Sequence, residues 1–593
     1  MFQKTLCQYL QLAGLLLLVA LLINPAPAQA QDPTSPETNS PFDPRFGVVD
    51  SFVNTAEANA AGVGWTRVFF RWDVVQPGGP SDWKPTNVPD TFLNAETEAG
   101  REVVAVLIGT PAWATDSRIS TAVPPLEFWG EFVFKIATQY QGRIKHWVIW
   151  HQPDITDPAS ASYTWAGNEE DYYRLVKEAY QKIKSVDPQM QVHLAGLTYT
   201  WDRDQGRPQY LARLLDVVLA DPQAAAENYY FDTVSYHIYY DPRQIFDILT
   251  DVRGILAARG LGSKPIWINE TNAPPSEDYL EPLAAPAAPS ISLQEQSAFV
   301  IQAFAMALVG GAERIAFNKM RNETNHPESV EPYGLLRGDN SRRPAFDAFR
   351  TVTTHFANTQ TAAWQQVGNV YVVTLDRAGQ TTTVVWNTAT TPVTVPLPAI
   401  AAEAILVDEQ GDEQPTAATD GIYNLELPGA SCSNGSNCFI GGAPRLLIEV
   451  GAPAQRPVLP AAAPQVTATP LAVPTPSPEP TNRPTAAPPP TLTPLPTLPA
   501  AAATAAPLNS AAAQSARGDN APLPAALPDP GVGQVGDNLA AAQPISPTLT
   551  VVPPITFRTV MSPRRILWLF IIGLIVFTVS YGVQVTIWYR FKR

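Results

Sequence analysis

The stretch Trp147-Val148-Ile149-Trp150-His151-Gln152-Pro153-Asp154 is a short apolar run that ends in polar residues. Its length and its aromatic and β-branched residues are typical of a buried strand. In a parallel barrel, the residues at the carboxyl ends of the strands face one shared pocket. The polar residues after this run are therefore candidates for a functional site.

Seven more apolar runs of this kind occur along the chain, separated by longer amphipathic stretches. They are Phe46–Val49, Thr66–Phe70, Val103–Ile108, Val192–Ala195, Thr233–Tyr236, Ile266–Ile268 and Arg314–Phe317. Together with Trp147–Trp150 they make eight strand-and-helix units, which predict a (β/α)8 TIM barrel over 41–358. A doubly wound open sheet is the alternative, although no glycine-rich phosphate turn follows the first strand.

Helix-capping signals support the alternation of strands and helices. Ser292 and Glu295 form a capping box that opens a helix ending at Gly310. Asn168 can cap a helix over Glu169–Lys184. Beyond the barrel, alternating β-branched runs at Val370–Leu375, Thr382–Trp386 and Arg445–Val450 predict a small β-sandwich over 361–451.

The two ends of the chain predict export and anchoring. Residues 1–30 read as a signal peptide, with an apolar run and a small-residue cleavage site at Ala28-Gln29-Ala30. Residues 566–588 are apolar and long enough to cross a bilayer core of roughly 30 Å. We therefore expect a single-pass protein of the cell membrane, with its folded domains on the extracellular side and 589–593 as a cytoplasmic tail.

The segment between the folded part and this helix cannot bury a core. Residues 452–562 are dominated by proline, alanine and threonine, which predicts a solvated, disordered linker. O-glycosylation and a plain spacer both remain open for it. In an oxidising compartment, Cys432 and Cys438 suit a disulfide that closes a surface loop.

The charge balance restricts the class of partner. With 39 basic and 54 acidic residues, the formal net charge is −15, which disfavours nucleic acid and anionic lipid surfaces as ligands. A neutral ligand such as an oligosaccharide or polysaccharide fits this balance, and the bilayer is contacted through the C-terminal helix alone. No zinc-binding pattern occurs in the sequence, so no metal or other cofactor is implied.

Several motifs together resemble one large clan of retaining glycoside hydrolases. These enzymes carry their catalytic carboxylates on strands four and seven, and the β-xylosidase, α-L-iduronidase and cellulase-like relatives are the nearest in pattern. Trp147–Asp154 resembles the strand with the acid/base, and Pro265–Thr271 resembles the strand with the nucleophile. Supporting motifs include Gly64-Trp65-Thr66-Arg67-Val68 and Tyr333-Gly334-Leu335-Leu336, so the resemblance covers roughly 41–349.

The resemblance implies roles for individual residues. Glu270 matches the nucleophile, which forms a glycosyl-enzyme intermediate. Arg67 and Tyr239 would keep it ionised, although an ion pair of Arg67 and Glu270 without chemistry is the plain structural alternative. His237 matches a histidine that contacts substrate in the clan. Trp113, Trp150 and Trp165 could stack on sugar faces, with barrel core as the alternative for Trp150 and loop packing for Trp165. Strand eight ends in Asn318-Lys319-Met320, where many relatives have a tryptophan.

The acid/base position is substituted. Gln152 stands where the clan has a glutamate, and His151 stands where it usually has an asparagine. An amide cannot deliver a proton, and loss of general acid catalysis typically costs about 10² to 10⁴ in rate. Activity could persist if His151 donates the proton, if Asp154 or Asp157 takes the place of Gln152, or if the leaving group needs no acid. In plant thioglucosidases, a related barrel family, glutamine stands at this position and activity on such substrates persists.

We therefore predict a membrane-anchored, glycoside-hydrolase-like protein whose activity on glycans is weak, altered or lost. The alternative of a different class is a non-catalytic glycan-binding or adhesion protein that keeps the cleft. A structural protein of the cell surface is the third.

Overall fold

The computed structural model describes residues 41–451 except 86–87, 283–288, 324–331, 434 and 436–437. The predicted signal peptide, linker, membrane helix and tail lie outside the described residues. Within the described part, no helix combines the length and apolar character needed to span a bilayer.

Eight parallel strands close into a barrel in which each strand pairs with the next along the chain and β8 pairs with β1. The strands are β1 (Phe46–Val49), β2 (Trp65–Arg71), β3 (Glu102–Ile108), β4 (His146–Ile149), β5 (Gln191–Leu197), β6 (Thr233–Tyr239), β7 (Ile266–Asn272) and β8 (Arg314–Phe317). The closed barrel confirms the predicted fold and excludes the open doubly wound sheet.

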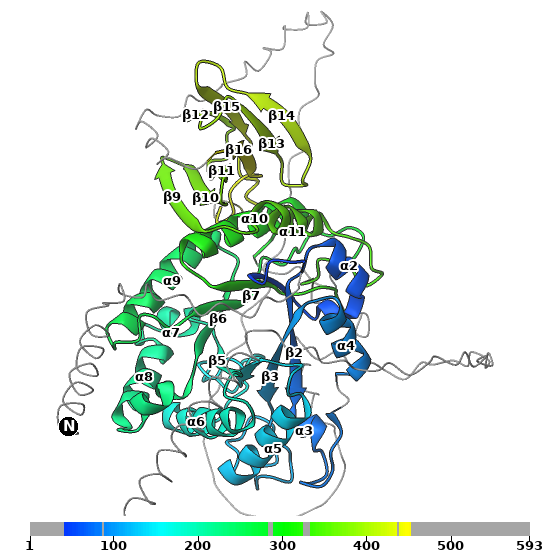
Figure 1. The fold of residues 1–593 in the computed structure, drawn as a ribbon, viewed down its shortest axis with the longest axis vertical. Helices are drawn as coiled ribbons and strands as arrows, with labels where there is room; N and C mark the ends of the chain where they lie inside the picture. The colour runs from blue at the N-terminus through cyan, green and yellow to red at the C-terminus, as the bar shows by residue number, and fades with distance from the viewer. Residues whose placement is uncertain are drawn as a thin grey trace, which may run out of the picture. The chain divides into compact units, whose positions relative to one another are not determined.

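Helices surround the barrel strands (Figure 1). They are η1 (Ser51–Asn54), α2 (Thr55–Ala60), α3 (Trp72–Val75), α4 (Asp90–Glu98), α5 (Leu126–Gln139), α6 (Glu169–Val186), α7 (Thr200–Asp204), α8 (Tyr210–Ala220), η3 (Ala224–Tyr230), α9 (Pro242–Ala257), α10 (Leu293–Val309) and α11 (Pro344–His355). Both predicted helix starts are present as capping boxes, on Asn168 with Asp171 and on Ser292 with Glu295.

Antiparallel strands follow the barrel in two sheets. A six-stranded sheet has the order β14-β13-β16-β11-β10-β9, and a two-stranded sheet pairs β12 with β15. Their bounds are β9 (Thr361–Val367), β10 (Val370–Asp376), β11 (Gln380–Asn387), β12 (Val393–Pro398), β13 (Glu403–Val407), β14 (Glu413–Ala417), β15 (Ile422–Leu427) and β16 (Arg445–Val450).

The central strands β10, β11 and β16 of the six-stranded sheet are buried on both faces. Tyr371, Val373 and Trp386 belong to the hydrophobic core of the barrel. Their neighbours Val372 and Val385 belong to a second core, which the two-stranded sheet completes. Because successive residues of a strand point to opposite faces, this alternation places the six-stranded sheet between the barrel helices and the smaller sheet.

Helix α10 lies at the contact between the barrel and the six-stranded sheet. Nearly all of its residues are buried, as expected of a helix that is apolar on every side. The buried amide of Gln302 donates to the carbonyls of Gly441 and Gly442 and accepts from the N–H of Gly441. The sheets are therefore hydrogen-bonded to the barrel as well as packed on it.

Candidate functional site

Four barrel strands bring the predicted site residues to one end of the barrel. Arg67 lies on β2, His237 and Tyr239 on β6, and Glu270 on β7. His151 and Gln152 lie just after β4. The strand ends before Trp150, which has a left-handed φ of 73°. The pairing register shifts between β6 and β7 at Tyr236/His237 and between β7 and β8 at Ile268/Thr271. Such bulges re-aim side chains and are common beside active sites.

Glu270 is held by a cation and a phenol. Its Oε1 pairs with Nη2 of Arg67, and its Oε2 accepts a hydrogen bond of 2.5 Å from the hydroxyl of Tyr239. Glu270 is 6% exposed and Arg67 1% exposed. Burial alone would raise the pKa of Glu270, but Arg67, the neighbouring histidines and Tyr239 together hold that pKa well below its usual range. Arg67 contributes most to this lowering of the pKa, because its charge is permanent. Glu270 is thus ionised at neutral pH.

Tyr239 keeps its proton for this contact. Burial and the negative charge of Glu270 raise the pKa of Tyr239 well above its usual value. Its oxygen accepts a hydrogen bond of 2.9 Å from Nδ2 of Asn318. The comparison with the clan marks Asn318 only as a departure. Asn318 nevertheless follows β8 directly, at the same strand-end position as other residues of the site.

His237 lies between Arg67 and Gln152. Its Nε2 is 3.3 Å from Nη1 of Arg67, and its Nδ1 is 2.8 Å from the side-chain nitrogen of Gln152. Burial, partly opposed by Glu270, lowers the pKa of His237 well below its usual value, so the ring is neutral. Arginine can only donate, so Nε2 accepts and Nδ1 carries the proton. An amide can turn either its oxygen or its nitrogen to a neighbour, and the oxygen of Gln152 is the partner that this N–H requires.

Gly196 of β5 makes room for this arrangement. A Cβ at this position would lie 2.0 Å from Nε2 of His237. The carbonyl of Gly196 also accepts a hydrogen bond from the backbone N–H of Gln152. The sequence analysis missed this residue, although a glycine inside a strand is a signal for close approach of another group.

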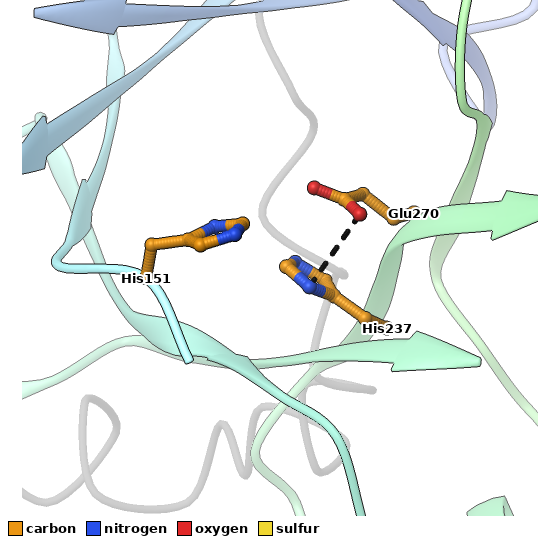
Figure 2. A group of neighbouring side chains, drawn as sticks. All are labelled: His151, His237 and Glu270. Atoms are coloured by element: carbon orange, nitrogen blue, oxygen red, sulfur yellow. Dashed lines mark ion pairs between the residues drawn. The ribbon is translucent and has the colours of Figure 1, made fainter. Parts of the chain in front are cut away.

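His151 completes the group at the barrel end. Its side chain is 5% exposed, and its ring lies 4.9 Å from the ring of His237 and 5.4 Å from that of Phe69. Figure 2 shows the rings of His151 and His237 beside the Glu270 carboxylate, with Nδ1 of His237 3.6 Å from Oε2 of Glu270. Gln152 has a left-handed φ of 46°, a strained conformation that is typically retained at functional sites.

The same three side chains are the ones that could hold a metal ion. Ligand atoms of His151, His237 and Glu270 all lie within 4.8 Å of one another. A metal-bound imidazole donates its second N–H to an acceptor, however, and the neighbour of Nε2 in His237 is Arg67, which has no acceptor. The group therefore fits a hydrogen-bonded network around an ionised carboxylate better than a metal centre.

Asp154 and Asp157 point to other partners. The Oδ2 of Asp154 accepts hydrogen bonds of 2.8 and 2.7 Å from the N–H and hydroxyl of Thr198. Burial raises the pKa of Asp154 to about 6, although these bonds lower it. Asp157 is exposed and accepts from the backbone N–H of Ala159. Both carboxylates hold the loop after β4 in shape, which does not favour either as a substitute for Gln152.

The predicted aromatic platforms pack against other aromatic residues. Trp113 lies after β3, where its ring contacts Trp72 and Phe128 and its Nε1 donates to the carbonyl of Gln76. Trp113 is half-buried, and its contact with a sugar stays a prediction. Trp150 and Trp165 are buried against each other with ring centroids 4.9 Å apart.

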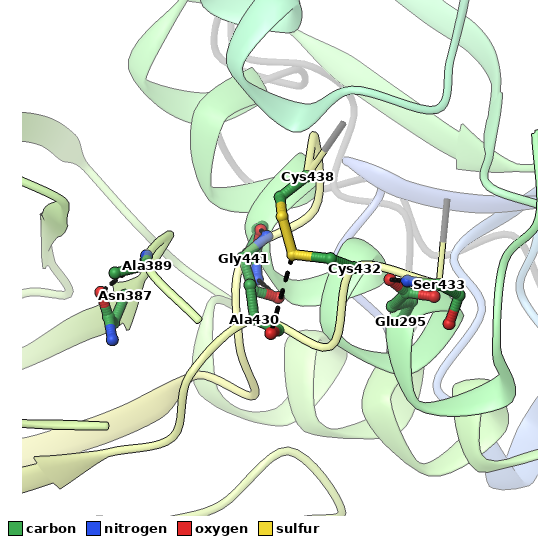
Figure 3. The surroundings of a disulfide bond; sticks show 9 residues. Glu295, Asn387, Ala389, Ala430, Cys432, Ser433, Cys438 and Gly441 are labelled. Carbon is green, nitrogen blue, oxygen red and sulfur yellow. Dashed lines mark hydrogen bonds between the residues drawn. A yellow bond between two sulfur atoms is a disulfide. The ribbon is translucent and has the colours of Figure 1, made fainter. Parts of the chain in front are cut away.

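The two cysteines of the folded part are joined. Cys432 and Cys438 form a disulfide with their Cα atoms 4.7 Å apart (Figure 3). Next to it, the N–H of Ser433 donates to Oε1 of Glu295, the capping-box residue of α10. The disulfide-closed loop is thus attached to the start of α10.

Comparisons with known proteins give the fold a wider setting. No protein-family model and no curated protein matches the sequence. A solved family 39 glycoside hydrolase from the gut symbiont Bacteroides cellulosilyticus is similar, with a TM-score of 0.53 and 18% identity over 69% of this chain and 81% of that one.

Two further solved structures are also similar to this chain. A glucosidase from Croceicoccus marinus has a TM-score of 0.48 and 13% identity over 66% of this chain and 91% of that one. A monomeric β-xylosidase from Caulobacter crescentus has a TM-score of 0.47 and 12% identity over 70% and 98%. At these identities the likeness concerns the fold, and by fold the described part of the chain is a glycoside-hydrolase-like (β/α)8 barrel.

Proposed function

We propose that the barrel end binds a glycan and that Glu270 is a nucleophile in a retaining-type site that lacks the usual acid/base. The observation that carries the proposal is the environment of Glu270, where Arg67 and Tyr239 occupy one oxygen each and keep the carboxylate ionised at neutral pH. An attacking carboxylate has to be in this form.

Gln152 supplies no proton, so the proposed activity depends on the leaving group. Its side chain contacts Nδ1 of His237 at 2.8 Å, which is a contact that a glutamate could also make. His151 is the titratable neighbour of Glu270 that could act as a proton donor. The expected substrates are therefore glycosides whose leaving group departs without protonation, or departs with the help of His151.

The test uses the full-length protein and a panel of 2,4-dinitrophenyl glycosides, with and without azide. These leaving groups need no acid, so turnover is expected with the sugar that fits, and azide should accelerate it by attacking the glycosyl-enzyme. Glu270→Gln should abolish it. Gln152→Glu should extend turnover to poorer leaving groups, with a gain of about 10² to 10⁴ in rate. Absence of turnover in both the unaltered protein and Gln152→Glu, across the whole panel, would contradict the proposal.

A glycan receptor is the second candidate, and the amide at position 152 favours it. Replacement of a proton donor by an amide removes catalysis while leaving a hydrogen-bonding group for sugar hydroxyls. This function predicts saturable binding on a glycan array without turnover of any dinitrophenyl glycoside.

We further propose that the folded domains lie outside the cell and that the C-terminal helix anchors them in the membrane. The signal-like residues 1–30, the apolar residues 566–588 and the proline-rich segment between 452 and 562 support this arrangement. Protease treatment of intact producing cells should release a soluble fragment with the barrel. Protection of the barrel until the cells are lysed would contradict the arrangement.

A further inference from the structure

Asp50 is a carboxylic acid at the site end of the barrel that the proposed mechanism does not use. It follows β1 directly, and the register pairs Val49 with Arg67 on β2 and Val48 with Phe317 on β8. The backbone N–H of Asp50 donates to the carbonyl of Arg67 at 3.3 Å. Asp50 therefore lies at the site end of the barrel where β1 passes between β8 and β2, and β2 carries Arg67 of the Glu270 network.

The carboxyl group of Asp50 does not cap the helix that follows it. Aspartate at the N-cap of a helix ordinarily accepts a bond from the helix backbone. Asp50 is the N-cap of η1, yet its side chain makes no capping hydrogen bond. Its backbone is left-handed, with φ 57° and ψ 37°, which costs energy for a residue other than glycine.

Other carboxylates at this end of the barrel are occupied. Both oxygens of Glu270 are bonded, Asp154 is bonded to Thr198, and Asp278 pairs with two arginines. Among the described residues, no side-chain hydrogen bond or ion pair to the Asp50 carboxyl group is present. Asp50 is half-buried, and its carboxyl group has no partner in the described part of the chain to give up before it binds a ligand.

The surroundings of Asp50 contain charges of both signs. Lys319 and Glu323 face it from the β8–α11 connection, Arg67 from β2 and Glu270 from β7. Burial raises the pKa of Asp50 to about 7, Lys319 and Arg67 act to lower it, and Glu323 and Glu270 act to raise it. The group is thus both donor and acceptor near neutral pH, which suits contacts with hydroxyl groups.

We propose that Asp50 is a sugar-binding residue of this site, whose carboxyl group hydrogen-bonds hydroxyls of the sugar ring that lies against Glu270. The inference rests on the proposed function. This role is distinct from that of Gln152, which lies after β4. Asp50 would bind hydroxyl groups of the sugar ring, and the leaving group would lie next to Gln152.

The test compares Asp50→Asn and Asp50→Ser with Asp154→Asn in the full-length protein. Asp154→Asn is the matched control, because Asp154 is a second carboxyl with a raised pKa, and an asparagine keeps an oxygen for the bonds from Thr198. With the dinitrophenyl glycoside that is turned over, or the array glycan that is bound, both Asp50 variants should raise KM or Kd by about 10- to 100-fold, the cost of a lost bond to a charged group. The change in kcat should be smaller, and Asp154→Asn should leave KM within about twofold of the unaltered protein.

A pH profile separates sugar contact from a merely structural role. In the unaltered protein, KM or Kd should change as pH passes through about 7, and this change should be absent from Asp50→Asn. Circular dichroism verifies that each variant is folded. If the unaltered protein turns over or binds a glycan and Asp50→Asn does so with the same KM or Kd, the role of Asp50 is wrong and the proposed function stands. If the unaltered protein does neither, both are wrong.

Discussion

At the scale of single residues, the site is organised around one charge that cannot be neutralised. Arg67 fixes the ionised form of Glu270 and also the tautomer of His237, because it can only donate to either. One carboxylate oxygen and both ring nitrogens are thereby assigned by one guanidinium. The substitution of the acid/base by Gln152 leaves this half of the site intact.

Tyr239→Phe tests the second contact of Glu270. Its hydroxyl donates to the ionised carboxylate at 2.5 Å, so its removal should raise the pKa of Glu270 by about one to two units. The acidic limb of the pH profile for dinitrophenyl glycoside turnover should then move to higher pH. Tyr240→Phe is the control, because Tyr240 touches Tyr239 through its ring. An unchanged acidic limb in Tyr239→Phe would show that Arg67 alone sets the pKa.

Gly196→Ala tests the space under His237. The added methyl group would overlap Nε2, which lies 2.0 Å from the ideal Cβ position. Because His237 is buried and bonded on both sides, it has to move, and we expect at least about a tenfold loss of turnover or glycan affinity. Gly254→Ala is the matched control. Its added methyl group meets nothing within 4 Å on helix α9, so it should stabilise the protein by up to about 1 kcal/mol. Equal effects of the two variants on activity would contradict this account.

At the scale of elements, α10 determines how the sheets are attached to the barrel. Gln302→Leu would leave the N–H of Gly441 and two carbonyls without their partner. Unsatisfied buried groups cost about 1 to 3 kcal/mol each, so the free energy of unfolding should fall by about 3 kcal/mol. Urea denaturation measures the change. Gln410→Leu, which removes one half-buried bond to Ser297, should cost less than about 1 kcal/mol.

The strands and capped helices could be predicted because each is encoded locally. The run Phe46–Val49 and the run Arg314–Phe317 match β1 and β8 in both bounds. Strands β6 and β7 extend past their predicted ends to Tyr239 and Asn272, because polar residues that line the pocket continue the sheet. Hydropathy alone ends a strand too early there.

The hydrogen-bonded group around Glu270 could be predicted only for the residues that match the clan pattern. Arg67, His237, Tyr239 and Glu270 lie together as that pattern implies. Gly196 and Asn318 were missed, since their contacts with His237 and Tyr239 join segments that are distant in the sequence. Such contacts have no periodic signal in a single sequence.

At the scale of the whole molecule, two buried histidines at the other end of the barrel strands tie stability to pH. Nδ1 of His146 lies 2.9 Å from Nε2 of His193. Burial lowers the pKa of both residues, that of His193 well below its usual value. In the unfolded chain both histidines take up a proton near pH 6.5, whereas in the folded chain they do so only at lower pH. Their contribution to stability is therefore complete above about pH 6.5 and is lost as pH falls below it.

His193→Gln should flatten this dependence. Between about pH 7 and pH 5, the melting temperature of the variant should fall less than that of the unaltered protein, because one buried ionisable ring is gone. Differential scanning calorimetry at several pH values provides the measurement. His355→Gln should flatten the dependence to a similar extent, because burial lowers the pKa of His355 to about 4, which is also below this pH range. An identical slope for His193→Gln and the unaltered protein would show that this pair does not govern the acid response.

The position of β16 has a mechanical consequence. This strand lies between β13 and β11 in the six-stranded sheet, and the chain leaves the described part directly after it, at Gly451. A pull on the C-terminal side would therefore load an interior strand with a hydrogen-bonded neighbour on each side. Two ladders have to rupture together before the strand slides out. Tension at that end would be borne first by an interior strand of this sheet and not by a strand of the barrel.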